Sequence, residues 1–445
     1  MGYDCLGDRG AGVRPFDLAI VGFGPTGAVL ANLCGLYGVR VVVFERSAEP
    51  YPQPRACHLD AEIARVLAQC GFGDELDNLL TVSAGMEYVD AKGTRLFSFE
   101  GFDRAPLLGW HEDYVFVQPQ LDAIVRAGVH RFASVEVRLG EEAPPLEELL
   151  DLADWIVGCD GASSVTRRQL EVPLVDLGYD QQWLVVDLRI HPGTDLQLPD
   201  IIQQVCDVHR PTTFVPSHAW HRRWEFQLAP GETPDPWALL RPWGVTPADA
   251  DLVRAVPYRF HALVAARWSG GPGGRVMIAG DAAHQMPPFM GQGMCSGIRD
   301  AANLAWKLAA AARGEAMTAL ETYESERRPH VEAVTRLSVE AGRLLDDIAA
   351  KLETGRVPVF PMPDAMDPTR WSRLPGLDLG GEFPVGHQVP GPPGLDEQLG
   401  LEWAWVAGQS GFTPDDGRPV IVEPAATYGH RAVLVRPDRY IAAVA

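Results

Sequence analysis

Residues 17–27 read DLAIVGFGPTG, and this stretch decides the fold. Its first letters form a short apolar run, which is typical of a strand buried in a parallel sheet. Pro25 suits the first turn of a helix, and apolar residues at helical spacing follow from Val29 to Leu36. A second apolar run, VVVF at 41–44, completes a β-α-β unit. The pattern predicts an α/β protein that begins with a Rossmann-like, mostly parallel sheet.

The turn between the first strand and the helix carries the spacing GxGxxG. The first glycine allows a tight turn, the second lets the backbone approach a pyrophosphate, and the third lets the helix pack closely on the strand. An acid at the end of the second strand can accept hydrogen bonds from a ribose. This pattern predicts a cofactor that contains ADP, without separating NAD from FAD. The residues concerned are Gly22, Gly24, Pro25, Thr26, Gly27, Glu45 and Arg46.

In two later segments, a predicted strand is again followed by an acidic residue in a glycine-containing turn. Residues 275–284 read RVMIAGDAAH, and Asp281 is well placed to accept hydrogen bonds from a polyol such as the ribityl chain of a flavin. PPFMGQG at 287–293 follows, and then an Ala-rich helix whose dipole would stabilise negative charge on a reduced flavin. Residues 155–168 read WIVGCDGASSVTRR and deliver Asp160 in the same way. Either segment alone is most often only a turn.

Taken together, these motifs resemble the single-component FAD-dependent aromatic hydroxylases, the group A flavoprotein monooxygenases. The matching pieces are GxGxxG at 22–27, DG at 160–161 and GD at 280–281, and the stretch 280–309 is the most specific. Within that family the chain is most similar to the 3-(3-hydroxyphenyl)propionate hydroxylases, over nearly its whole length. Shorter supporting pieces are PRA at 54–56, QPQ at 118–120, QWLVVD at 182–187, CDVHRP at 206–211, YESERRP at 323–329 and RPDRYIAAVA at 436–445.

The resemblance implies bound FAD and the residues that hold it. Glu45 would hold the adenosine ribose, Arg55 and Gln118 would lie along the FAD, and Asp281 would hold its ribityl–pyrophosphate region. Asp160 would serve both FAD and the NADH or NADPH that binds transiently. No second GxGxxG is found, and the family likewise lacks a separate nicotinamide domain. Pro287 to Gly293 would line the isoalloxazine edge and the substrate pocket. The residues of this region expected to bind the cofactor are Gly280, Asp281, Pro288, Gly291, Gln292, Gly293 and Met294.

The activity implied is hydroxylation of a phenolic ring by NAD(P)H and O₂ through a flavin C4a-hydroperoxide. The substrate expected is a small aromatic acid such as 3-(3-hydroxyphenyl)propionate. Alternatives are hydroxylation or Baeyer–Villiger oxidation of a polycyclic natural product, a non-catalytic flavin-binding chain and, with less support, an NAD-dependent dehydrogenase. The candidate catalytic residues are Pro287 and Pro288 for ring positioning, His284 as a base, with His58 and His209 behind it, and Arg210 as a carboxylate anchor. A histidine placed next to a strand, such as His284, is more often structural than catalytic. An arginine such as Arg210 is at least as often a solvated surface residue as a carboxylate anchor.

Composition shifts suggest where the domains divide. Residues 1–175 and 266–355 would form the FAD-binding domain, with an antiparallel substrate-binding sheet inserted at 176–265. A Pro- and Gly-rich linker at 356–395 would lead to a small β-rich module at 396–445, resembling a reduced thioredoxin-like domain. Two departures from the family stand out. The segment 140–154 looks helical where relatives have a β-meander, and the terminal module is short.

Charge and cysteine content narrow the partners. The 445 residues carry a formal net charge of −21, which disfavours binding to nucleic acid or an anionic membrane. Seven scattered cysteines without a CxxC favour reduced thiols in a cytoplasmic protein rather than a disulfide or metal framework. We see no secretory leader and no apolar run long enough to span a membrane. The resemblance leaves a homodimer open.

Overall fold

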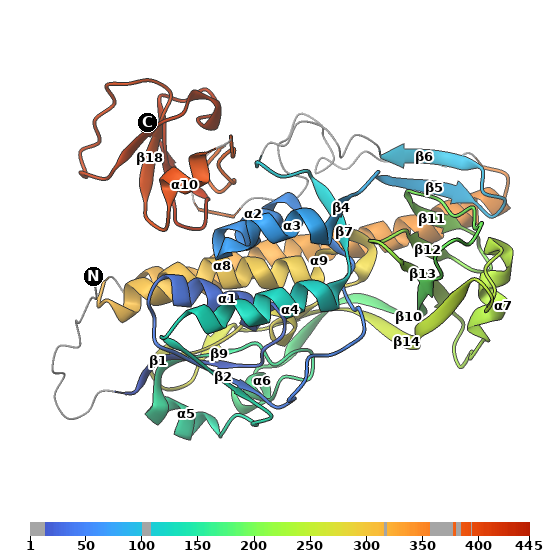
Figure 1. Cartoon of the computed structure of the whole chain (residues 1–445), viewed down its shortest axis with the longest axis horizontal. Helices are drawn as coiled ribbons and strands as arrows, with labels where there is room; N and C mark the ends of the chain where they lie inside the picture. Colours follow the sequence, from blue (N-terminus) through green and yellow to red (C-terminus); the bar gives the residue numbers. More distant parts are fainter. Residues whose placement is uncertain (1–13, 100–107, 316–317, 357–376, 380–383, 393) are drawn as a thin grey trace.

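The computed structural model describes residues 14–99, 108–315, 318–356, 377–379, 384–392 and 394–445. Two long helices, α8 (Gln292–Ala312) and α9 (Thr318–Glu353), run along the middle of the molecule (Figure 1). A six-stranded sheet lies on one side of them, and a larger sheet lies at one end of the molecule. The chain is therefore an α/β protein that combines a parallel sheet with an antiparallel one.

The six-stranded sheet has the order β15-β16-β9-β1-β2-β8, and all its pairings are parallel except that of the edge strand β15. The predicted opening is confirmed, because α1 (Pro25–Leu36) links β1 and β2 as a parallel crossover. The central residues of β1 are fully buried, as an apolar run requires. The strands are β1 (Phe16–Val21), β2 (Val41–Glu45), β8 (Val135–Leu139), β9 (Ala153–Gly158), β15 (Ser269–Gly270) and β16 (Val276–Ile278).

The larger sheet has the order β17-β14-β10-β13-β12-β11-β5-β6. It contains strands of the predicted region 176–265, but it also recruits β5 and β6 from residues 86–99, for which the sequence predicted no strand. Only the β11–β5 pairing is parallel. Its strands are β5 (Met86–Asp90), β6 (Arg95–Phe99), β10 (Leu174–Ile190), β11 (Ile202–Cys206), β12 (Thr212–Val215), β13 (His221–Leu228), β14 (Ala250–Ala265) and β17 (His284–Gln285).

The two faces of this sheet have different partners. Leu184, Phe214, Trp224 and Phe226 fill one face and pack against the region of α7 (Pro236–Leu240). The opposite face looks toward the cofactor domain. Because side chains alternate along a strand, residues between these apolar positions, such as Trp183 and Val185, point the other way and pack with α9.

Helix α9 is longer than the sequence indicated. The apolar spacing from Val331 to Leu352 predicts an amphipathic helix over that range only, and a proline inside a helix removes a hydrogen bond. The structure continues it back through Pro329 to Thr318. Contacts on the added segment stabilise it: the Tyr323 hydroxyl donates to the Ile278 carbonyl at 2.9 Å, and Arg327 Nε donates to Asp300 Oδ1 at 2.9 Å. Tertiary packing has outweighed the local preference.

Smaller elements complete the cofactor domain. The three-stranded sheet β3-β7-β4 and the helices next to it cover one side of α1 and α8. The helix expected within 140–154 is confirmed as α5. These elements are β3 (His58–Asp60), β4 (Leu80–Val82), β7 (Asp113–Phe116), α2 (Ala61–Leu67), α3 (Gly73–Leu79), α4 (Gln118–Gly128), α5 (Leu146–Leu152) and α6 (Val165–Gln169).

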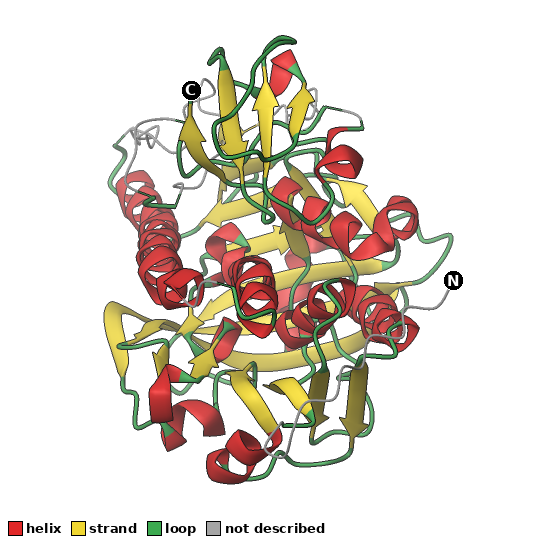
Figure 2. Ribbon diagram, turned by 90° about the vertical axis from the view of Figure 1, so that its left-hand side faces the viewer, coloured by secondary structure: helices red, strands yellow, loops and turns green. Residues whose placement is uncertain are grey.

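The terminal module forms a separate four-stranded sheet, β19-β18-β20-β21, at the top of the molecule in Figure 2. Only its β18–β19 pairing is parallel, and the likeness to a reduced thioredoxin-like domain stays a prediction. Most of the predicted linker, 356–395, lies outside the described residues. The elements of the module are α10 (Leu395–Leu399), β18 (Ala404–Ala407), β19 (Val420–Val422), β20 (Ala432–Val435) and β21 (Ile441–Val444). No helix in the described part of the chain is long and apolar enough to cross a membrane.

Candidate active site

One continuous cavity of about 1680 Å³ runs from the β1–α1 turn to the inner face of the eight-stranded sheet. Sites for a single small ligand usually measure about 300–1,000 Å³. This cavity therefore has room for a large cofactor and a second molecule. At one end it is lined by the predicted dinucleotide turn, and at the other by strands β10 to β13, β5 and β14.

The β1–α1 turn has the geometry of a phosphate cradle. Gly22 has a φ of +99°, and a Cβ there would lie 2.5 Å from the Cys159 carbonyl oxygen. A Cβ on Gly27 would lie 2.1 Å from the Gly22 carbonyl oxygen, so this glycine permits helix and strand to pack and does not line the cavity. A Cβ on Gly24 would meet no protein atom within 4 Å and would project into open cavity. The backbone at Gly24 is thus open to a ligand, beside the positive end of α1.

Glu45 and Arg46 line the cavity next to this turn, as predicted. The Glu45 carboxylate accepts hydrogen bonds from the backbone N–H groups of Phe23 and Ser47, each at 2.9 Å. These two bonds fix the carboxylate at the end of β2, where remaining lone pairs can accept from a ribose. The structure therefore brings Glu45 and the glycine turn together as the sequence spacing indicates.

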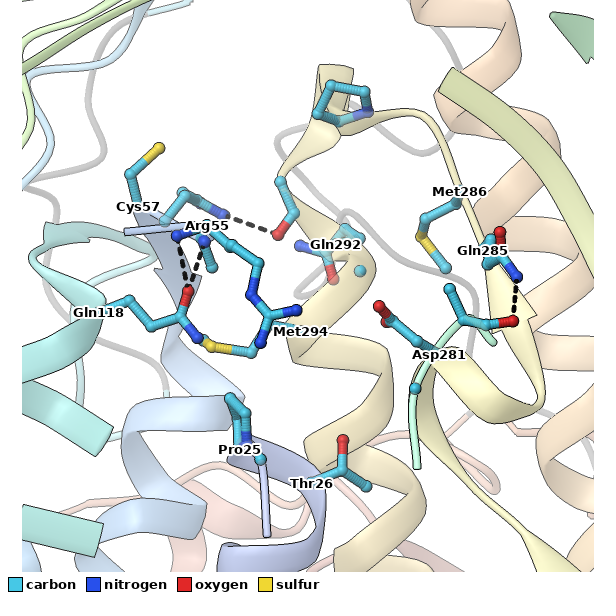
Figure 3. Close-up of a pocket in the computed structure, with 18 of the residues that line it drawn as sticks. Pro25, Thr26, Arg55, Cys57, Gln118, Asp281, Gln285, Met286, Gln292 and Met294 are labelled. Carbon is cyan, nitrogen blue, oxygen red and sulfur yellow. Dashed lines mark hydrogen bonds between the residues drawn. The ribbon is translucent and has the colours of Figure 1, made fainter. Parts of the chain in front are cut away.

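Arg55 and Gln118 lie on one wall of the cavity (Figure 3). Gln118 Oε1 accepts from the backbone N–H groups of Arg55 at 2.9 Å and Ala56 at 2.7 Å. Gln118 is itself buried, so its side chain positions the loop that carries Arg55. The Arg55 guanidinium lies 5.0 Å from the centre of the Tyr51 ring and points into the cavity.

Asp281 projects from the opposite wall, facing Arg55 in Figure 3. Among the described residues no hydrogen-bond donor contacts its carboxylate, which is open to the cavity. Desolvation by the surrounding protein raises the pKa of this carboxyl group, although His284 and Arg55 act to lower it. Asp281 is thus free to accept hydrogen bonds from a bound polyol.

Asp160 also lines the cavity, but its carboxylate already accepts hydrogen bonds from neighbouring protein groups. Ser164 Oγ donates to Asp160 Oδ1 at 2.5 Å, and the Thr166 backbone N–H donates to Oδ2 at 2.9 Å. These bonds shape the turn that leads into α6. The structure therefore gives Asp160 a loop-forming role beside the predicted contact with FAD and NAD(P)H.

The loop before α8 presents backbone to the cavity. Gly291 has a φ of +64°, and a Cβ there would lie 2.3 Å from His58 Nδ1. A Cβ on Gly293 would meet no protein atom, so the space beside it is open. The Gln292 amide is bound on both sides, donating to Asp60 at 3.0 Å and accepting from Arg299 at 2.9 Å. A flat ring would therefore meet the backbone of this loop, flanked by Pro288 and Met294, which both line the cavity. Gly280 does not line it, and a Cβ there would lie 2.6 Å from Thr26 Oγ1.

Three predictions for catalytic residues are corrected. Pro287 is buried and does not line the cavity, whereas Pro288 does. His284 is 1% exposed, lies outside the cavity lining, and shares a 2.8 Å hydrogen bond between its Nε2 and Asp300 Oδ2. Its ring stacks on Trp268, so it is a core histidine. His58, a weaker candidate, does line the cavity and pairs with Asp113 at 2.7 Å.

Arg210 is the third correction. Both of its terminal nitrogens donate to the Glu232 carboxylate, at 2.9 and 2.6 Å, and Nη1 also donates to the Gln227 carbonyl. Arg210 is not among the residues that line the cavity. A guanidinium that is already paired and lies outside the cavity cannot anchor a substrate carboxylate there.

The structure also reveals a row of site residues that were not predicted. Tyr88, Gln204, Thr213, Glu225 and Val185 are direct cross-strand neighbours, one on each of five adjacent strands, and all line the cavity. Of this row, only Glu225 has a recognisable sequence pattern: it lies in RWEFQL at 223–228, where charged residues alternate with Trp and Phe. Such alternation normally marks a solvent face.

A buried charge cluster borders this row. Asp187 accepts from Arg223 Nε at 2.7 Å and from Arg254 Nε at 2.8 Å, and its Oδ1 lies 2.7 Å from His221 Nε2. Burial alone would raise the pKa of Asp187, but Arg223 and His221 lower it well below its usual range. Burial lowers the pKa of His221, which favours the neutral ring. The cluster ties β10, β13 and β14 together at the edge of the cavity.

Comparison with known proteins identifies the family. Residues 16–338 match a family model described as an FAD binding domain. The probable NADH-specific resorcinol 4-hydroxylase of Rhodococcus jostii is 32% identical over 97% of this chain and 92% of that protein. The 3-(3-hydroxy-phenyl)propionate/3-hydroxycinnamic acid hydroxylase of Comamonas testosteroni is 37% identical over 73% of this chain and 58% of its own length. The chain belongs to the FAD-dependent aromatic hydroxylases.

Solved structures support the same fold. The anhydrotetracycline hydroxylase OxyS from Streptomyces rimosus superposes with a TM-score of 0.73, at 24% identity over 97% of this chain and 96% of that one. The flavin-dependent monooxygenase PieE, in complex with FAD and substrate, gives a TM-score of 0.74 at 19% identity, with coverages of 97% and 96%. The cofactor of this hydroxylase is FAD, and the open backbone at Gly24 and Gly293 together with the free Asp281 carboxylate fits it.

Proposed function

We propose that this hydroxylase uses NADH and O₂ to add a hydroxyl group to a small phenolic ring bound beneath the eight-stranded sheet. The observation that carries the proposal is the continuity of the cavity. The dinucleotide cradle opens directly into a chamber lined by Val185, Phe260, Phe289 and the row from Tyr88 to Glu225. The name of the Rhodococcus relative supports NADH as the electron donor.

The chamber combines aromatic walls with the polar row. Phe260 stacks on Trp183 with ring centroids 5.6 Å apart, and Phe289 meets Trp183 edge-on at 5.4 Å. Such rigid aromatic walls exclude water and hold a flat ring in one orientation. Bound FAD supplies the activation of oxygen. The chain supplies the cradle for FAD, the Pro288 edge of the loop and the polar row that meets the substrate.

Oxidation of NADH by the FAD-loaded protein tests the proposal. Resorcinol and 3-(3-hydroxyphenyl)propionate are each added while hydrogen peroxide and the organic products are quantified. We expect a phenol to accelerate NADH oxidation at least tenfold, with more hydroxylated product than peroxide. A protein that holds FAD but shows no acceleration with any phenol would contradict the proposal. Lactone products from a ketone would indicate Baeyer–Villiger chemistry instead.

A further inference from the structure

Glu225 is a buried carboxylate without a hydrogen-bond donor. It is 6% exposed and lines the chamber from the middle of β13. Within the described residues its nearest cation is Arg223, whose Nη1 lies 4.0 Å from Glu225 Oε1. No described hydrogen bond reaches either carboxylate oxygen. Burying an acceptor without a donor is costly, so a ligand group that donates here would gain binding energy.

Two arginines next to Glu225 are directed chiefly to another carboxylate, that of Asp187. Arg223 donates from Nε and Nη2 to Asp187, and its terminal nitrogens also donate to the carbonyls of Pro54 at 2.9 Å and Arg55 at 2.6 Å. Arg254 is directed to the same Asp187 carboxylate. Arg223 and Arg254 together balance the charges of Asp187 and Glu225. A substrate carboxylate in this part of the chamber would add an uncompensated negative charge.

The side chains that flank Glu225 in the row do not donate a hydrogen bond to it. Thr213 Oγ1 donates to Gln204 Oε1 at 2.7 Å, so these two flanking side chains satisfy each other. Val185 on the other side is apolar and 4% exposed. Beside these two neighbours, the Glu225 carboxylate faces the chamber as an acceptor to which no described residue donates. A phenolic hydroxyl matches it, and a carboxylate does not.

From this geometry, and resting on the proposed function, we infer that Glu225 accepts a hydrogen bond from a ring hydroxyl and selects neutral dihydroxybenzenes such as resorcinol over phenolic acids. The inference differs from the sequence expectation of an aromatic acid, for which Arg210 was the candidate anchor. Burial raises the pKa of Glu225 despite the charge of Arg223, which is consistent with a carboxylate that is short of donors.

Binding to the oxidised, FAD-loaded protein tests the inference without turnover. Dissociation constants for resorcinol and for 3-(3-hydroxyphenyl)propionate are measured from the perturbation of the flavin absorbance, in wild type and in Glu225→Gln. We expect wild type to bind resorcinol at least tenfold more tightly. Glu225→Gln should weaken resorcinol about tenfold, the size expected for a hydrogen bond to a charged group, and should tighten binding of the acid. Glu232→Gln, which alters a carboxylate outside the cavity, is the matched control and should change neither constant.

The outcomes separate this inference from the proposed function. A wild type that prefers the acid overturns the selection even if the variant fails to fold. A correctly folded Glu225→Gln, with normal FAD content and melting temperature, that keeps the preference for resorcinol overturns the role of Glu225. If instead both ligands bind as inferred but neither stimulates NADH oxidation, the proposed function fails while the binding role of Glu225 stands.

Discussion

The Asp281 carboxylate points into the cavity and makes no hydrogen bond to the described protein, so its removal leaves the fold intact. We expect Asp281→Ala to weaken FAD binding by about 1.5–3 kcal/mol, or roughly 10- to 150-fold, because a charged acceptor for the ribityl chain is lost. The ratio of flavin to protein absorbance and a fluorescence titration of the apoprotein measure this. Asp176→Ala, outside the cavity, is the control, and stoichiometric FAD in purified Asp281→Ala would refute the role.

Arg210 offers the opposite case, a charged residue whose removal should leave the site unchanged. Its guanidinium is paired with Glu232 outside the cavity. We expect Arg210→Ala to change the dissociation constant of 3-(3-hydroxyphenyl)propionate less than twofold. Stability should fall by at most about 1 kcal/mol, since the ion pair is partly exposed. Flavin-perturbation titrations and a thermal melt measure the two effects. A tenfold loss of affinity for the acid alone would restore Arg210 as an anchor.

At the scale of elements, two glycines of the β1–α1 turn have different roles: Gly27 is needed for folding and Gly24 for cofactor binding. A methyl group on Gly24 meets only cavity, whereas one on Gly27 would lie 2.1 Å from a carbonyl oxygen. Gly24→Ala should therefore keep the melting temperature of the apoprotein and lose FAD. Gly27→Ala should destabilise the apoprotein itself by about 1–3 kcal/mol through overpacking. Thermal melts with and without added FAD compare the two variants. Equal melting temperatures for the two apoproteins would contradict this division.

The same turn shows which parts of the fold the sequence predicts well. Strand, turn, helix and acid lie within 30 residues, so local preferences and the cofactor motif determine them together. Glu225 and Arg223 could not be assigned in this way, because their burial depends on the cofactor domain that covers the sheet. The recruitment of β5 and β6, and the path of α9 through Pro329, likewise depend on long-range packing. Arg210 and His284 were wrongly predicted to be site residues, because residue type alone does not reveal that Arg210 pairs with Glu232 and His284 with Asp300.

At the scale of the whole molecule, ion pairs of two buried arginines join the terminal module to the cofactor domain. Arg65 binds Asp396 through two 2.7 Å hydrogen bonds, and Arg436 Nη2 lies 2.9 Å from Glu326 on α9. Tyr428 and Tyr440 of the module also line the cavity. The module therefore closes part of the site, and its attachment bears on cofactor retention as well as on stability.

Glu326 provides the test of this attachment, because it lies between Lys307 at 3.0 Å and Arg436. Burial opposes its ionisation, but the two cations lower its pKa from 4.5 to about 2. A lowered folded-state pKa stabilises the protein fully above the unfolded value near 4.5, and this stabilisation is lost as the pH falls through 2. At pH 7, Glu326→Gln should cost about 3 kcal/mol by leaving two buried cations short of a counter-charge.

The difference in stability between wild type and Glu326→Gln should thus be constant above about pH 5 and shrink toward pH 2, since protonated Glu326 resembles glutamine. Total tryptophan fluorescence, to which Trp306 and its neighbour Trp403 of the module contribute, follows the transition in denaturant at each pH. Glu315→Gln is the control, because its exposed pair with Arg313 contributes at most about 1 kcal/mol. If the variant kept the wild-type midpoint at pH 7, the buried pair would not hold the module. If the difference instead grew in acid, the lowered pKa would be wrong.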